Sequence, residues 1–337
     1  MTGVVGVAVV VAPELIVLAS TPAGAPRSGM APQLSLTLVT FSAADPGGWE
    51  HLAERARLAD QAGIDRLAVS DHVAFGPDLD AYADPSQGGI AGGRQPTGPD
   101  GRWLEPLTVI AHLTAVTERV RFTTNILLAA LRRPVVLAKT TSTIDVLSSG
   151  RLDLGVGVGW QRHEYLAAGL SFAERGRQLD HTLAVCQTLW SGNDVEFVDD
   201  RLQFDHIWQE PKPGGGAVPI WVSGTTQPRA MRRLARFGAG WIPWGDDAAD
   251  ITAGITRMRA AVEAEGRDPG GLGVVGNLPS VVDDAGAVDL EATMAAVPAL
   301  TAAGVTDFRG NVRLGATDEQ ALDELSRYVE AFRSATA

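Results

Sequence analysis

The sequence has 337 residues, 45% hydrophobic and 20% charged, which suits one or two globular domains and excludes a disordered or fibrous protein. Asp and Glu number 40 against 28 Lys and Arg, and this net charge of −12 argues against nucleic acid or an anionic membrane as a partner. The single cysteine, Cys186, excludes an internal disulfide and a cysteine-based zinc site, so we expect a cytoplasmic protein.

The first thirty residues differ from the rest of the chain. Pro13 and Glu14 interrupt their apolar stretch, and no Lys or Arg precedes Arg27. A bilayer span needs about 20 apolar residues, and a secretory signal carries positive charge before its apolar core, so neither fits. We expect residues 1–30 to be a disordered or dispensable N-terminal extension, with Met30 as the candidate initiator.

From residue 34 onward, short runs rich in β-forming residues alternate with longer segments of helical periodicity. This alternation is typical of βα units around a parallel sheet. The predicted strands are residues 34–40, 66–70, 120–126, 152–157, 219–223, 240–243, 273–277 and 305–311.

The first and last helices illustrate the segments between these strands. The first, which Gly63 ends, gathers its apolar residues on one face and places its charged residues, Asp60 among them, elsewhere. Before the last helix, Thr317 and Gln320 have the spacing of a capping box. An apolar stripe follows, formed by Leu322, Leu325, Val329 and Phe332.

Eight strands and about eight helices over roughly 300 residues predict an α/β fold, a (β/α)8 TIM barrel formed by residues 31–337. A doubly wound open sheet is the alternative. Residues 74–102 and 193–216 are too long to be simple connections, and the second has the pattern of a small hairpin. We expect both insertions at the carboxyl ends of the strands, where barrel active sites form.

Asp71 and His72 directly follow the second predicted strand, which places an imidazole at the catalytic end of a barrel. The dipeptide alone is also consistent with a histidine that only holds a loop. Trp160 follows three glycines at the end of the fourth strand, residues 155–159, and we expect it to line a cavity. The glycines permit either tight packing or close approach of a flat ring.

Ser223, Gly224, Thr225 and Thr226 follow the fifth strand, and Pro228 then begins a helix. Hydroxyls and free N–H groups at a helix N-terminus suit a phosphate, although an ordinary N-cap has the same appearance. The chain lacks a GxSxG elbow, a P-loop, an HExxH motif and the HxH of metal-dependent barrel hydrolases, so no metal site is predicted.

These motifs, in this order, resemble the bacterial luciferase-like monooxygenase superfamily, and within it the coenzyme F420-dependent oxidoreductase branch. The resemblance runs from about residue 34 to residue 332. It rests on residues 70–72, 121–126, 132–134, 138–139, 149–152, 155–160, 172–175, 189–192, 211–213, 219–222 and 238–243.

The resemblance implies roles for individual residues. His72 would act beside the reactive ring centre as a proton donor, a proton acceptor or a substrate anchor, with Asp71 supporting it and Trp160 beside them. Asn125 and Ile126 match the position of a non-prolyl cis peptide that bulges against the ring. The cofactor would be bound by Asp71, Asn125, Ile126, Gly157, Val158 and Gly159, and its phosphate by Ser223, Gly224, Thr225 and Thr226. The substrate pocket would be formed by Trp160, His163 and Trp244.

The resemblance further implies hydride transfer between F420 and a small, moderately hydrophobic carbonyl compound, alcohol or activated alkene. Trp160 stands where the sugar-phosphate dehydrogenases of this branch have a catalytic glutamate, and no tryptophan is evident in the loop after Asp71 and His72, which argues against glucose-6-phosphate oxidation. The partners implied are a small-molecule substrate, a second copy of the chain in a homodimer, and a separate reductase or F420-reducing dehydrogenase. Two alternatives remain open, an FMN-dependent two-component monooxygenase that uses oxygen and a non-catalytic flavin-binding protein.

Overall fold

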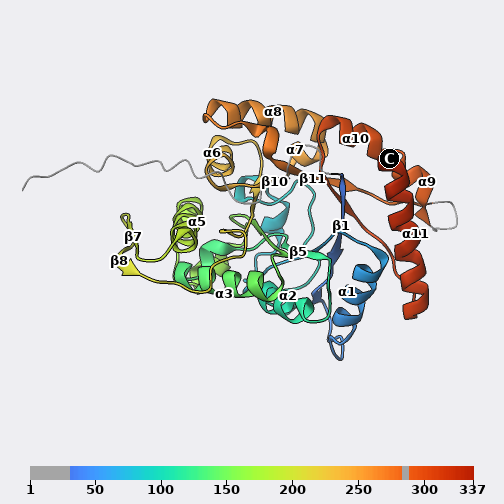
Figure 1. Cartoon of the computed structure of the whole chain (residues 1–337), viewed down its shortest axis with the longest axis horizontal. Coiled ribbons are helices and arrows are strands. Elements are labelled where there is room, and N and C mark those ends of the chain that lie inside the picture. The colour runs from blue at the N-terminus through green and yellow to red at the C-terminus, as the bar shows by residue number, and fades with distance from the viewer. Residues whose placement is uncertain (1–30, 283–287) are drawn as a thin grey trace, which may run out of the picture.

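A closed ring of eight parallel strands forms the centre of the fold (Figure 1). The computed structural model describes residues 31–282 and 288–337, so the predicted N-terminal extension lies outside the described residues. Around the ring the order is β1 (Gln33–Leu38), β14 (Asp307–Gly310), β11 (Gly273–Leu278), β10 (Gly240–Pro243), β9 (Ile220–Gly224), β6 (Leu152–Val156), β5 (Arg121–Thr124) and β3 (Arg66–Val69). Because β1 pairs with both β3 and β14, the ring is closed, which confirms the eight predicted strands and the barrel over the open sheet.

Helices surround the ring, and the last packs beside the first, where the ring closes (Figure 1). No helix among the residues described is long and apolar enough to cross a membrane. The helices are α1 (His51–Ala62), α2 (Pro106–Thr114), α3 (Pro134–Leu147), α4 (Arg162–Ala167), α5 (Arg175–Ser191), α6 (Pro228–Phe237), α7 (Asp246–Ala249), α8 (Ile251–Ala264), α9 (Leu290–Met294), α10 (Val297–Ala303) and α11 (Asp318–Thr336).

The predicted helix ends are confirmed. Gly63 ends α1 in the left-handed conformation, with a φ of 90° that a side chain would disfavour. Thr317 and Gln320 form the expected capping box before α11. The prediction for Asp60 was wrong: this carboxylate is buried and accepts the backbone N–H groups of Glu118, Arg119 and Val120. It fixes the turn that leads into β5.

A buried ionic cluster fills the amino-terminal end of the barrel. Arg66 on β3 forms salt bridges with Asp153 on β6 and Asp307 on β14. The guanidinium of Arg66 also lies 5.0 Å from the ring centre of Trp221. A Cβ at position 240 would lie 2.3 Å from that indole, so Gly240 makes room for it. Because this end is filled, a ligand can enter only at the carboxyl ends of the strands.

The two long insertions take different positions. Residues 74–102, named here the mouth segment, lie at the carboxyl ends of the strands as expected, and end at β4 (Arg102–Trp103), which pairs with β2 (Phe41–Ser42). Residues 193–216 contain the predicted hairpin, β7 (Val195–Val198) with β8 (Gln203–Ile207), but follow α5 and lie outside the helical ring (Figure 1). Arg177 on α5 pairs with Asp200 at the hairpin tip, so this segment covers α5 rather than the strand ends. A third small ribbon joins β12 (Val281–Val282) to β13 (Val288–Asp289).

Candidate active site

At the upper end of the barrel, side chains that face its inside are exposed to solvent. The hydroxyl of Ser35 bonds to the carboxylate of Asp307 inside the barrel, so Thr37 and Val39, two and four residues further, point to the same side. Val39 is 50% exposed, and Thr37 and the inward-facing Asn277 are also exposed. An opening to solvent, named here the cavity, therefore lies over β1 and β11, at the carboxyl ends of the strands.

The peptide bond between Asn125 and Ile126, directly after β5, is cis, as the resemblance implied. The side chain of Ile126 lies over Gly157, where an added Cβ would approach its Cδ1 atom to 2.2 Å. The chain then rejoins the sheet, because Leu127 donates its N–H to the carbonyl of Gly155. Ile126 and Gly157 thus form a tightly packed apolar floor for the cavity.

The other glycines of this run also serve close packing. Gly159 has a φ of 69°, and a Cβ there would lie 2.6 Å from Leu128. The carbonyl of Gly159 is in turn 3.2 Å from the Cβ position of Gly88, which belongs to the mouth segment. Val158, between Gly157 and Gly159, is partly buried, and its carbonyl accepts a hydrogen bond from the hydroxyl of Tyr165. The run therefore joins the barrel to the segment above it.

A carboxylate that the sequence analysis missed holds His72. Glu164 on α4 has a fully buried carboxylate, with Oε2 3.2 Å from Nδ1 of His72. Its Oε1 accepts the N–H of Val73 at 2.6 Å and that of Ala74 at 3.3 Å. In the tautomer that carries the proton on Nδ1, His72 donates to Oε2 of Glu164. Nε2 is left for a ligand.

The resemblance implied that Asp71 supports His72, but in the structure Asp71 binds other groups. Its carboxylate instead accepts the N–H of Leu128 and two bonds from the guanidinium of Arg132, at 2.7 and 3.1 Å. Arg132 also pairs with Glu105. Asp71 and His72 are adjacent in sequence but have different partners, because successive side chains along an extended segment point to opposite sides. Asp71 holds the segment after the cis peptide in place.

Aromatic side chains surround His72. Trp103 presents its ring edge-on at a centroid distance of 4.8 Å, Phe75 lies at 4.4 Å and Trp160 at 5.8 Å. Trp103 is itself stacked on Phe41. Trp103 directly follows the mouth segment, so its approach to His72 depends on that segment folding back. The result is an apolar enclosure around one imidazole.

The mouth segment crosses the barrel opening. It begins after β3, and β10 lies opposite β3 in the ring. The indole of Trp244, just after β10, donates to the carbonyl of Gly89 at 3.0 Å. Tyr82 lies between, with its ring 5.2 Å from Trp160 and 6.5 Å from Trp244. Burial raises the pKa of the Tyr82 phenol, so this hydroxyl stays protonated near neutral pH.

The three residues predicted for the substrate pocket have different neighbours. Trp160 is buried between His72 and Tyr82, while Trp244 is partly buried under the mouth segment. His163 packs against Gly76 and bonds to Gln161. A further residue near Trp160 was missed, since Nε2 of the buried Gln161 has no hydrogen-bond partner within residues 31–282 and 288–337. That amide is a donor available to a ligand.

The expected phosphate site is only partly available. Thr226 donates its N–H at 2.7 Å and its hydroxyl to the carboxylate of Asp247, which also binds Arg257. The carboxylate of Asp247 therefore occupies both donors of Thr226. The prediction that Thr226 holds the phosphate is corrected accordingly. Ser223, Gly224 and Thr225 are partly exposed. These three, with the start of α6, keep the character of a phosphate site.

The cavity has the features that a flavin or deazaflavin ring requires. Ile126 over Gly157 provides an apolar floor. The exposure of Thr37 and Asn277 shows that this end of the barrel is open to solvent, and the unpartnered amide of Gln161 provides a donor. No group of three or more side chains suited to bind a metal ion occurs in the described part of the chain. The residues present thus fit a tricyclic ring with a phosphate on its side chain.

Comparison with known proteins gives concordant matches. The family model described as luciferase-like monooxygenase matches residues 30–335. The uncharacterized protein Rv0953c of Mycobacterium tuberculosis is 29% identical over 281 residues, which cover 82% of this chain and 91% of that protein. The F420-dependent hydroxymycolic acid dehydrogenase of the same organism is 26% identical over 238 residues, covering 70% of this chain and 60% of that protein.

Two further matches are monooxygenases. The pyrimidine monooxygenase RutA of Allorhizobium ampelinum is 29% identical over 185 residues, covering 51% of this chain and 50% of that protein. The crystal structure of the monooxygenase RslO1 from Streptomyces bottropensis superposes with a TM-score of 0.69 at 19% identity, covering 90% of this chain and all of that one. At this identity the likeness shows the fold alone.

Proposed function

Since the chain belongs to the luciferase-like monooxygenase family, and is thus an oxidoreductase, we propose that it depends on coenzyme F420 and acts on a small, moderately hydrophobic alcohol, carbonyl compound or activated alkene. The relative named as an F420-dependent hydroxymycolic acid dehydrogenase supports the choice of cofactor and of alcohol chemistry. The observation that carries the proposal is the environment of His72.

His72 has the features of a proton acceptor for alcohol oxidation. When an alcohol carbon loses a hydride, its hydroxyl proton must pass to a base, and the reverse reaction needs that proton returned. With the proton on Nδ1, facing Glu164, Nε2 of His72 carries a lone pair that can take the proton of the alcohol. Glu164 then stabilises the imidazolium by charge. The aromatic enclosure of Trp103, Phe75 and Trp160 excludes water from this exchange.

A bound deazaflavin would supply the hydride acceptor or donor. Its ring would lie on Ile126 and Gly157, with Val158 and Gly159 beside it and Asn125 and Gln161 offering polar contacts. Ser223, Gly224 and Thr225 would hold its phosphate.

Titration of the protein with F420 and with FMN, followed by cofactor fluorescence, tests the cofactor. We expect F420 to bind more tightly, and preferential binding of FMN or no binding of F420 would overturn the proposal. For catalysis, His72→Asn should bind F420 as wild type does but lose single-turnover reduction of F420 by cyclohexanol or propan-2-ol. His51→Asn, which changes an exposed histidine on α1, is the matched control.

An FMN-dependent two-component monooxygenase is the second candidate, because RutA is among the relatives. It would consume oxygen with reduced FMN supplied by a separate reductase. A non-catalytic flavin-binding protein would bind cofactor yet show neither reaction. We further propose a cytoplasmic homodimer that depends on a separate F420-reducing dehydrogenase. Light scattering should give twice the mass of the chain.

A further inference from the structure

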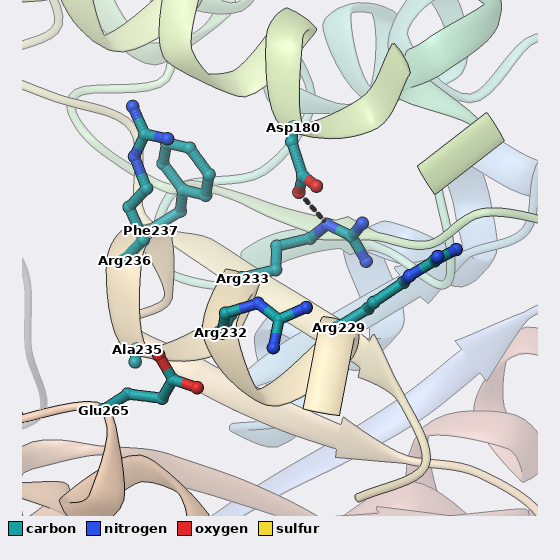
Figure 2. Close-up of a pocket in the computed structure, with 8 residues that line it drawn as sticks. All are labelled: Asp180, Arg229, Arg232, Arg233, Ala235, Arg236, Phe237 and Glu265. Carbon is teal, nitrogen blue, oxygen red and sulfur yellow. Dashed lines mark hydrogen bonds and ion pairs between the residues drawn. The ribbon is translucent and has the colours of Figure 1, made fainter. Parts of the chain in front are cut away.

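Helix α6 presents a row of arginines to a surface cavity of about 340 Å³ (Figure 2). They stand at helical spacings of three, four and seven residues, so they share one face. Asp180 on α5 and Glu265 after α8 border the same cavity, and four arginines against two carboxylates leave it with a charge of +2. The arginines, named here the arginine face, are Arg229, Arg232, Arg233 and Arg236.

Among the residues that the structure describes, one member of the arginine face is held by a salt bridge. Arg233 is buried, pairs with Asp180 and donates to the carbonyl of Gly176. Arg229, Arg232 and Arg236 are exposed and form no salt bridge within the described ranges. In a chain of net charge −12, three neighbouring arginines without a carboxylate partner are unexpected. They indicate that an external anion is the missing partner.

The carbonyl groups at the C-terminal end of α6 do not neutralise the charge of Arg236. The last carbonyls of α6 would attract a nearby cation. Arg267 already donates to two of them, those of Leu234 and Ala235. Arg236 instead lies over the ring of Phe237, at 4.7 Å from its centre. Its charge is thus held at the cavity and stays available to a ligand.

The arginine face begins where the phosphate site ends. Arg229 lies in the first turn of α6, which follows Ser223, Gly224 and Thr225. From Arg229 to Arg236 the helix rises about 10 Å, enough to span roughly two or three extended residues. An anionic chain attached to the phosphate would therefore meet these arginines in succession.

We propose that the arginine face binds the oligoglutamate chain that F420 carries beyond its phosphate. This inference rests on the proposed function, and it names the part of the cofactor that separates F420 from FMN. FMN ends at its phosphate and has nothing to place against Arg232 or Arg236. Carboxylates spaced along a flexible chain suit guanidinium groups spaced along a helix.

The test compares F420 carrying several glutamates with the form that ends at its phospholactyl group, by fluorescence titration. Exposed ion pairs contribute little each, so we expect the glutamate chain to tighten wild-type binding about 5- to 30-fold, and less at high salt. Arg232→Ala combined with Arg236→Ala should remove most of that gain without weakening binding of the tail-less form. Arg327→Ala on α11, an equally charged and exposed change, should leave both affinities unchanged.

Each outcome bears on one claim. If both forms bind wild type equally well, the arginine face has no role in cofactor binding, while the F420 proposal stands. If the double variant weakens both forms equally, the arginines act on the fold or on the phosphate rather than on the tail, and the inference is wrong. If neither form binds, the proposed function itself fails, and this inference with it.

Discussion

Oε2 of Glu164 lies 3.2 Å from Nδ1 of His72, while Oε1 of the same carboxylate accepts the N–H of Val73. One buried side chain on α4 thus fixes both the ring of His72 and the backbone that follows it. The position of the His72 imidazole is therefore set by a residue 92 positions away in the sequence.

The first prediction concerns this pair. Glu164→Gln keeps an oxygen for Val73 but presents an amide N–H to Nδ1, so the proton of His72 should move to Nε2. Nitrogen NMR of His72 should show the change of tautomer. Because Nε2 can then no longer accept a proton, turnover should fall about 10- to 100-fold. Glu263→Gln, an exposed change on α8, is the control. An unchanged tautomer would show that Glu164 does not set it.

The second prediction concerns the floor of the cavity. Gly157→Ala would place a methyl group 2.2 Å from Cδ1 of Ile126, so the isoleucine must move toward the cavity. We expect weaker cofactor binding, by about tenfold, with little loss of stability because the contact is with the flexible end of a side chain. Gly192→Ala, at an extended position with nothing within 4 Å, is the matched control. Unchanged affinity would place the ring away from this floor.

The third prediction concerns the mouth segment. Trp244→Phe removes the indole N–H that Gly89 accepts, at a cost of about 1 kcal/mol. Amide hydrogen exchange of residues 79–93 should become faster, while exchange in the barrel strands stays as in wild type. Trp208→Phe, which changes a 60% exposed side chain, should leave both unchanged. Equal exchange in the two variants would mean that other contacts hold the segment closed.

The fourth prediction concerns pH. Burial tends to raise the pKa of Asp60, but the backbone N–H groups of Glu118, Val120 and Arg119 outweigh burial and hold it below its usual value. The folded protein therefore binds this proton less readily than the unfolded chain does. The ionised Asp60 therefore stabilises the folded protein fully above the pKa of about 4 that Asp has in the unfolded chain. This stabilisation is lost as the pH falls through the lower pKa of Asp60 in the folded protein.

Asp60→Asn should accordingly lower the free energy of unfolding by about 1–3 kcal/mol near neutral pH. The difference from wild type should shrink as both proteins are unfolded with urea at progressively lower pH. Asp323→Asn on α11, whose carboxylate is exposed, is the control. A difference that stays constant with pH would mean that the charge on Asp60 is not what stabilises the turn.

Much of the fold could be predicted from local patterns. Strand positions, the end of α1 at Gly63 and the capping box at Thr317 depend on residues within one or two turns of each other. His72 could be placed at the catalytic end because it directly follows a predicted strand. Trp103 was missed because only the return of the mouth segment brings it to His72.

The sequence by itself determined the order of strands and helices and the candidate residues at the strand ends. Only the tertiary structure decided which polar groups meet: Glu164 with His72, Arg132 with Asp71, and Asp247 with Thr226. Periodicity and turn residues are local, so they can be recognised along the chain. A hydrogen bond between distant residues exists only after the ring of strands has closed and fixed the distance between its loops.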